Sequence, residues 1–220
     1  MACSRDFFSN LLEVARANLD LNSCTAVMIQ GDMCDALAPP AGFDFILINP
    51  PWRIVPEQVA YPNPRARVGW GRDGLDAVRR FLRDVPKLAS AGGSAIIRVD
   101  FPGTRQGFSF ERELADFVGK AGFRLLVRQG APIDISDQSM ISAQTCVHLN
   151  SPASVTELAR RFADNYRRLG FDTLYPSLCE LQNDRSERLE IKSGQAGLTP
   201  TWTESSESDI GSKECTEVLA

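Results

Sequence analysis

The chain has 220 residues, of which 43% are hydrophobic and 24% charged, and its formal net charge is −4 at pH 7. This composition is typical of a soluble globular protein with one domain of ordinary size and shorter extensions. The acidic balance disfavours a protein that holds nucleic acid mainly through phosphates, because such binding needs a basic face. No apolar run has the length of a membrane span and the N-terminus lacks a signal-peptide pattern, so we expect a cytoplasmic protein without a membrane partner. The six cysteines lack the paired spacing of zinc ligands, so we predict reduced thiols and no metal site.

Apolar periodicity predicts alternating helices and strands in the first half of the chain. Residues 9–22 have the three- to four-residue period of an amphipathic helix. Residues 25–30 and 43–49 are short apolar runs, and the second is apolar on both faces, as buried parallel strands tend to be. Residues 74–90 repeat the helical period, and residues 94–100 are predicted to form a third strand.

The second half continues this alternation. Residues 109–122 are predicted to form a helix that ends at Gly122, and residues 154–170 form another with a capping box at its start. Residues 123–130 and 142–150 are predicted strands with only a loop between them. Two such strands predict an antiparallel strand at one edge of the sheet.

The predicted fold class is therefore α/β, with a mostly parallel sheet covered by helices on both faces. We predict a main domain over residues 1–150 and a C-terminal helical extension over residues 151–185. From residue 186 to residue 220 Ser, Thr and Glu dominate, which predicts a disordered tail.

The predicted strand at residues 43–49 ends in the unusual tetrapeptide Asn49-Pro50-Pro51-Trp52. Proline has no N–H for a sheet ladder and restricts the residue before it, so the two prolines predict a rigid turn. Asp6 and Asp32 are also expected near the ends of strands, where ligands collect in open α/β sheets. A single Asp at such a place is more often a cap or turn residue, but three features in order form a pattern.

This pattern resembles the class I S-adenosylmethionine-dependent methyltransferases, in particular the branch with an N-P-P-aromatic motif. The resemblance covers residues 5–149 and implies S-adenosylmethionine as cofactor. It implies that Asp6 binds the ribose hydroxyls, that Asp32 contacts the adenine amino group and that Met33 packs on the adenine ring. It assigns the catalytic turn to Asn49, Pro50, Pro51 and Trp52, with Asn49 also in contact with the cofactor.

Physical chemistry supports such a role for the turn. Methyl transfer needs a nitrogen lone pair held in line with the methyl group. The side-chain oxygen of Asn49 and the carbonyl of Pro50 are two acceptors that can bind both hydrogens of a planar nitrogen, and Trp52 can stack on the flat group. The alternative is a proline-rich loop whose tryptophan covers the core.

The substrate is predicted from a second segment. Residues 70–82, WGRDGLDAVRRFL, resemble a G-x-D-G-L-D segment of the protein-glutamine N5 methyltransferases. This implies transfer to an amide or amine nitrogen of a protein or small molecule. One alternative is a methyltransferase of adenine or guanine in nucleic acid, and another is a non-catalytic remnant that serves as an interaction module. A basic rim for RNA or for an acidic substrate would be formed by Arg53, Arg65, Arg67 and Arg72, although such a set is more often a solvated loop.

One part of the family pattern is absent from these residues. The family has a glycine-rich turn after its first strand, which lies at the centre of the sheet, and the sequence contains no such motif. We therefore expect the sheet to lack its first strand, which is central in the family. An N-terminally truncated enzyme would have such a sheet. We also expect residues 1–220 alone to bind S-adenosylmethionine weakly, because no segment holds the methionine part.

Overall fold

The computed structural model describes residues 3–31, 33–37, 42–50, 52–56, 71–148, 154–184, 186–193 and 216–219. The chain forms two compact units, one made of Met1–Ala38 with Trp202–Ala220 and the other of Pro39–Thr201. In the part of the chain that is described, no helix is long and apolar enough to cross a membrane.

The smaller unit contains a helix and a two-stranded sheet. Its elements are α1 (Cys3–Leu21), β1 (Thr25–Met28), a 3₁₀ helix η1 (Met33–Ala36) and β9 (Thr216–Leu219). β1 pairs with β9 in parallel. The predicted helix and strand are thus present, with α1 starting six residues before the predicted residue 9. β9 corrects the prediction that residues 186–220 are disordered throughout.

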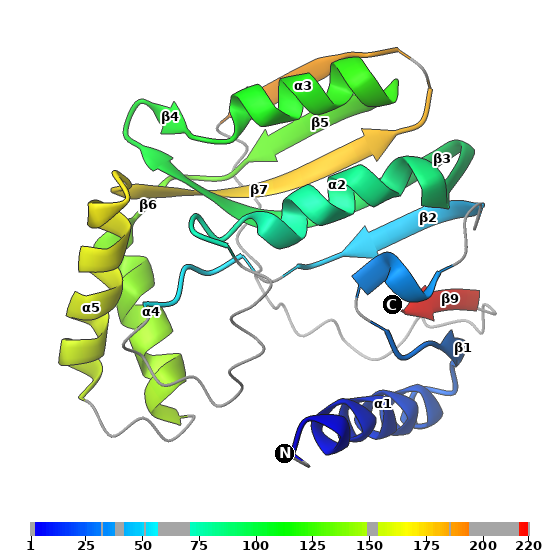
Figure 1. The fold of residues 1–220 in the computed structure, drawn as a ribbon, viewed down its shortest axis with the longest axis horizontal. Helices are drawn as coiled ribbons and strands as arrows, with labels where there is room; N and C mark the ends of the chain where they lie inside the picture. The colour runs from blue at the N-terminus through cyan, green and yellow to red at the C-terminus, as the bar shows by residue number, and fades with distance from the viewer. Residues whose placement is uncertain are drawn as a thin grey trace, which may run out of the picture. The chain divides into compact units, whose positions relative to one another are not determined.

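The larger unit is built on a mixed sheet (Figure 1). The strand order along the sheet is β2 (Phe43–Ile48), β3 (Ala89–Thr104), β7 (Thr173–Gln182), β5 (Arg124–Gln129) and β8 (Leu189–Ser193). Two short strands lie off this path: β4 (Gly107–Phe108) pairs with β3, and β6 (Ile133–Asp134) pairs with β7. Among the described residues β2 pairs only with β3, at the edge where the sequence predicts a missing strand.

Four strands of the sheet, β2, β3, β5 and β8, run in one direction, as predicted, but the antiparallel strand that was predicted at an edge lies inside the sheet. β2 and β3 are parallel, and so are β5 and β8, whereas β7 runs antiparallel to both β3 and β5. Residues 151–185 therefore contribute a central strand, which corrects the prediction of a helical extension. β7 contains Pro176. Proline has no N–H and is rare in central strands, so the sequence pattern did not predict a strand here. β8 likewise places the first part of the predicted tail in the sheet.

Two helices lie against one face of this sheet, α2 (Asp76–Leu88) and α3 (Glu111–Ala121) (Figure 1). Phe81 of α2 is 1% exposed, and alternate residues of β3 are buried to the same degree: Ala95, Ile97, Val99 and Phe101. Burying a side chain such as Phe81 contributes roughly 1.5–3 kcal/mol to stability. On the opposite face Phe45 and Leu47 are 55% and 71% exposed. α2 and α3 thus do not provide the predicted cover of both faces.

Two further helices, α4 (Ile135–His148) and α5 (Val155–Arg168), pack against each other beside β6 and the start of β7 (Figure 1). The helix predicted at residues 154–170 is present as α5. Its predicted cap is also present, since the Glu157 N–H donates to the Ser154 hydroxyl at 3.2 Å. α4 contradicts the prediction of a strand at residues 142–150. Its buried residues have helical spacing, but most are polar, so apolar periodicity misses them: Ile135, Gln138, Ser139, Ser142 and Ala143.

Candidate functional site

The predicted turn lies at the carboxyl end of β2. Asn49 follows β2 directly and its side chain is exposed, whereas Pro50 is buried. Trp52 is half-buried, and Pro51 lies outside the described residues. The buried proline anchors the turn, so the exposed amide of Asn49 projects from a fixed backbone.

The chain after this turn is held by α5. The N–H of Ile54 donates to the hydroxyl of Tyr166 at 3.3 Å, and both residues are buried. Trp52 packs against the same cluster, which also contains Ile135 and Leu174. Burial raises the pKa of Tyr166 to about 12, so its hydroxyl stays protonated at neutral pH.

A tight turn at residues 71–75 contacts the same segment from another direction. Gly74 has φ +80°, and a Cβ at this position would lie 2.5 Å from the carbonyl oxygen of Trp52. Only glycine combines this left-handed backbone with so close an approach. The predicted glycine of the G-x-D-G-L-D segment therefore lies directly against the N-P-P-W turn.

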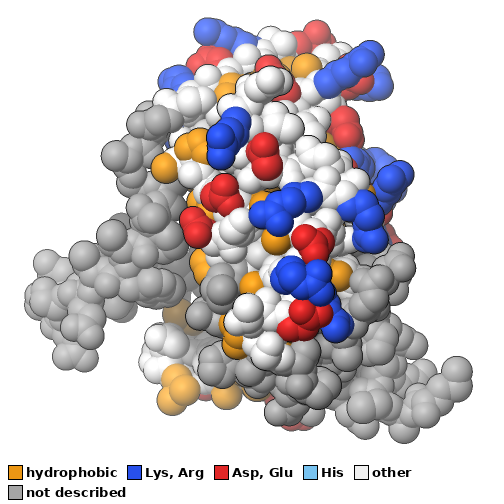
Figure 2. Space-filling model, turned by 90° about the vertical axis from the view of Figure 1, so that its left-hand side faces the viewer, with side chains coloured by type: hydrophobic (Ala, Val, Ile, Leu, Met, Phe, Trp, Pro, Cys, Tyr) orange, Lys and Arg blue, Asp and Glu red, His pale blue; other side chains and the backbone are white. Residues whose placement is uncertain are grey.

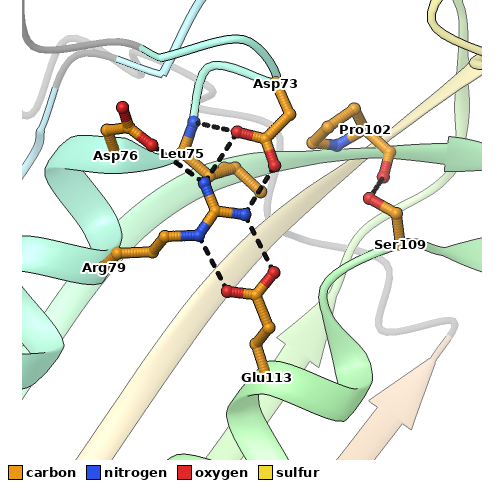
Figure 3. Close-up of polar contacts among 7 residues, drawn as sticks. All are labelled: Asp73, Leu75, Asp76, Arg79, Pro102, Ser109 and Glu113. Atoms are coloured by element: carbon orange, nitrogen blue, oxygen red, sulfur yellow. Dashed lines mark hydrogen bonds and ion pairs between the residues drawn. The ribbon is translucent and has the colours of Figure 1, made fainter.

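The 71–75 turn is fixed by an ion-pair network around Arg79 (Figure 3). Arg79 donates to both carboxylate oxygens of Asp73, at 2.8 and 2.6 Å, and to both of Glu113, each at 2.8 Å. It also donates to Asp76 at 3.0 Å. Asp73 in turn accepts the Leu75 N–H at 3.1 Å, which closes the turn. Paired forks of this kind are the strongest form of surface ion pair, and this one ties α2 to α3.

The network shifts the titration of its members. Burial alone would raise the pKa of Asp73, but its hydrogen bonds with Arg79 and the Leu75 N–H outweigh burial and lower the pKa overall. Hydrogen bonds to Asp73 and Glu113 raise the pKa of the Arg79 guanidinium further above its ordinary value. An open hollow lies beside the network, lined by Arg72, Asp73, Asp76, Arg79, Leu169 and Phe171.

A second charged group lies next to Trp52. The guanidinium carbons of Arg53 and Arg98 lie 5.5 and 5.9 Å from the centre of the Trp52 ring. Arg98 forms a short ion pair with Asp100, which is only 3% exposed. Burial raises the pKa of Asp100, and the charges of Arg98 and Arg53 oppose that shift.

Sequence reasoning missed three members of this site: Arg98, Asp100 and Tyr166. Arg98 and Asp100 belong to β3 and Tyr166 to α5, and neither element carries a motif at these positions. No local signal marks them, because Arg98 and Tyr166 approach Trp52 only through the strand register and the packing of α5, and Asp100 joins the site through its ion pair with Arg98.

The predicted cofactor residues belong to the smaller unit. Asp6 lies in the first turns of α1, which corrects the expectation that it lies near the end of a strand. Met33 begins η1, and the structure does not describe the side chains of Asp6 and Met33. Asp32 itself lies outside the described residues. Their approach to Asn49, which belongs to the larger unit, stays a prediction.

No family model matches the chain. Over 101 residues it is 33% identical to the ribosomal protein uL3 glutamine methyltransferase of Bordetella pertussis, a match that covers 43% of this chain and 34% of that one. Over 106 residues it is 32% identical to the release factor glutamine methyltransferase of Caulobacter vibrioides, covering 44% and 36% of the two chains. The matched region thus spans about a third of the length of each relative.

Among solved structures, one of a Bacillus halodurans protein assigned as a methyltransferase aligns with 80% of this chain and 79% of its own, at 13% identity and a TM-score of 0.44. A likeness of that size does not establish a shared function. Over less than half of its length, then, the chain is related in sequence to glutamine methyltransferases.

Proposed function

We propose that this chain carries the acceptor site of an S-adenosylmethionine-dependent methyltransferase, and that the methyl group goes to the amide nitrogen of a protein glutamine. The observation that carries the proposal is the exposed Asn49 on a proline-anchored turn at the carboxyl end of β2. The related proteins of Bordetella pertussis and Caulobacter vibrioides are glutamine methyltransferases, which supports the choice of acceptor.

The turn offers two hydrogen-bond acceptors of the kind that an amide requires. The Asn49 side-chain oxygen and the Pro50 carbonyl would each accept one N–H of the substrate amide. Holding both hydrogens orients the nitrogen and favours a more pyramidal, more nucleophilic geometry. The half-buried Trp52 provides an apolar wall beside the flat amide.

The residues present fit the adenosine part of the cofactor by their chemistry. The carboxylates of Asp6 and Asp32 would accept hydrogen bonds from the ribose hydroxyls and the adenine amine, and Met33 would pack on the ring. When bound, S-adenosylmethionine supplies a methyl group on a sulfonium. The role of Asn49 and Pro50 is then to aim the acceptor nitrogen at that group.

The proposal is tested by methyl transfer to defined substrates. The protein is incubated with isotope-labelled S-adenosylmethionine at a concentration that saturates even a weak site, together with a glutamine-containing peptide or an adenine-containing oligonucleotide. We expect label on the glutamine amide nitrogen, identified by mass spectrometry of the fragments. Label on adenine alone, or on neither substrate, contradicts the proposal.

A second prediction concerns the cofactor residues. Asp6→Ala and Asp32→Ala should each weaken the binding of S-adenosylmethionine by roughly 1–3 kcal/mol, about 5- to 150-fold, because each removes a charged acceptor. The dissociation constant is measured by calorimetric titration. Asp20→Ala is the matched control, since Asp20 lies exposed on the same helix and should leave the constant unchanged. Unchanged binding in both variants contradicts the assignment of residues 6 to 33.

A further inference from the structure

Two guanidinium groups converge on the tryptophan of the proposed acceptor site. Arg53 follows Trp52 in the chain, whereas Arg98 comes from β3, yet both guanidinium carbons lie within 6 Å of the Trp52 ring centre, at 5.5 and 5.9 Å. A guanidinium that stacks on an aromatic face keeps its N–H groups in its own plane, free to donate sideways. Contact with Trp52 therefore leaves both arginines able to bind an anion.

The strand register places Arg98 next to the acceptor amide. Ile48 and Ile97 are the last paired residues of the parallel strands β2 and β3. The next residue is Asn49 on one strand and Arg98 on the other. Since side chains alternate along both strands, these two lie on the same face of the sheet, one strand apart. A group bound by Arg98 would thus lie beside an amide bound by Asn49.

The charges around Trp52 do not balance within the described residues. Asp100 forms an ion pair with Arg98 and is 3% exposed, so its carboxylate is buried. The charge of Arg53 also acts on Asp100 and opposes the rise that burial causes in the pKa of that carboxyl, so Asp100 is shared with Arg98. Two guanidinium groups thus face one carboxylate, which leaves a net positive charge beside the turn.

We propose that Arg53 and Arg98 form an anion subsite that binds a carboxylate of the substrate, so that the accepted protein segment carries an acidic residue next to the methylated amide. The inference rests on the proposed function, because it assigns the amide to Asn49. The planar fork of arginine matches the two oxygens of a carboxylate.

The wider surface favours an acidic peptide over nucleic acid. On the face shown in Figure 2, basic and acidic side chains are interleaved rather than separated. Three arginines of α5, Arg160, Arg161 and Arg167, are paired with Glu157 or Asp164. Binding of nucleic acid depends on many phosphate contacts along a basic track, whereas one uncompensated charge suits one carboxylate.

The test compares two end-blocked tripeptides, alanine-glutamine-glutamate and alanine-glutamine-glutamine, which differ in one negative charge. Binding is followed by the NMR shift of the Trp52 indole N–H, in the absence of S-adenosylmethionine. We expect the acidic peptide to bind about ten-fold more tightly at low salt, with a smaller preference as ionic strength rises. Arg53→Gln should abolish the preference, whereas Arg112→Gln, on the exposed side of α3, should retain it.

Further variants and probes complete the design. The double variant Arg98→Gln with Asp100→Asn leaves no buried charge unpaired and should also lose the preference. Equal affinity for both peptides, or a preference that survives both variants, overturns the subsite. The assignment to a peptide is overturned if free glutarate binds the subsite as tightly as the acidic peptide does. It is also overturned if an oligonucleotide binds more tightly than the acidic peptide. Because no methyl transfer is measured, a charge preference without enzymatic activity would contradict only the proposed function.

Discussion

Replacing Asn49 with alanine is expected to lower the turnover number on the order of 100-fold, as the loss of one positioned hydrogen-bond group does in other enzymes. The variant removes the side-chain acceptor that holds the substrate amide, while Pro50 and the backbone of the turn remain. Binding of S-adenosylmethionine should change much less, because the adenosine is assigned to Asp6 and Asp32. The measurement is the rate of methyl transfer to the glutamine peptide at saturating cofactor, with the cofactor dissociation constant alongside.

The matched control for this substitution is Gln106→Ala. Gln106 also carries an exposed amide side chain, but it lies in the turn between β3 and β4, away from the carboxyl end of β2. Turnover should be unchanged in this control. If Asn49→Ala retains full turnover, the catalytic assignment of the N-P-P-W turn is wrong.

Gly74→Ala should destabilise the protein and reduce turnover together. Alanine at φ +80° costs about 1–3 kcal/mol of backbone strain, and its Cβ would meet the Trp52 carbonyl oxygen at 2.5 Å. The backbone of Trp52 must shift to relieve this contact, which moves the acceptor turn. A displacement of about 1 Å in a positioned site can cost on the order of 100-fold in rate. Chemical denaturation and the methyl-transfer rate are the two measurements.

Gly119→Ala provides the opposite result in the same assay. Gly119 lies in α3, has no left-handed φ, and an added Cβ meets nothing within 4 Å. Alanine there should raise the free energy of unfolding by roughly 0.5–1 kcal/mol and leave turnover unchanged. If Gly74→Ala folded and turned over like the unsubstituted protein, the 71–75 turn would not position the N-P-P-W segment.

Local patterns in the sequence determined several elements and the place of the acceptor turn. Helices α2, α3 and α5 follow from apolar spacing and, for α5, from the cap at Ser154. The strands β2, β3 and β5 follow from short apolar runs. The position of Asn49 directly after β2 follows from the prolines, because their effect on φ and on the hydrogen-bond ladder acts within one or two residues.

The tertiary structure alone decided which of these elements meet. β7 takes its place between β3 and β5 through pairing over long sequence distances, despite Pro176. α4 packs against α5, where Ala143 joins Leu158 and Phe162 in one buried cluster. The contacts of Trp52 with Arg98, of Ile54 with Tyr166 and of Gly74 with the Trp52 carbonyl join separate elements. Such contacts depend on register and packing, and no short stretch of sequence contains that information.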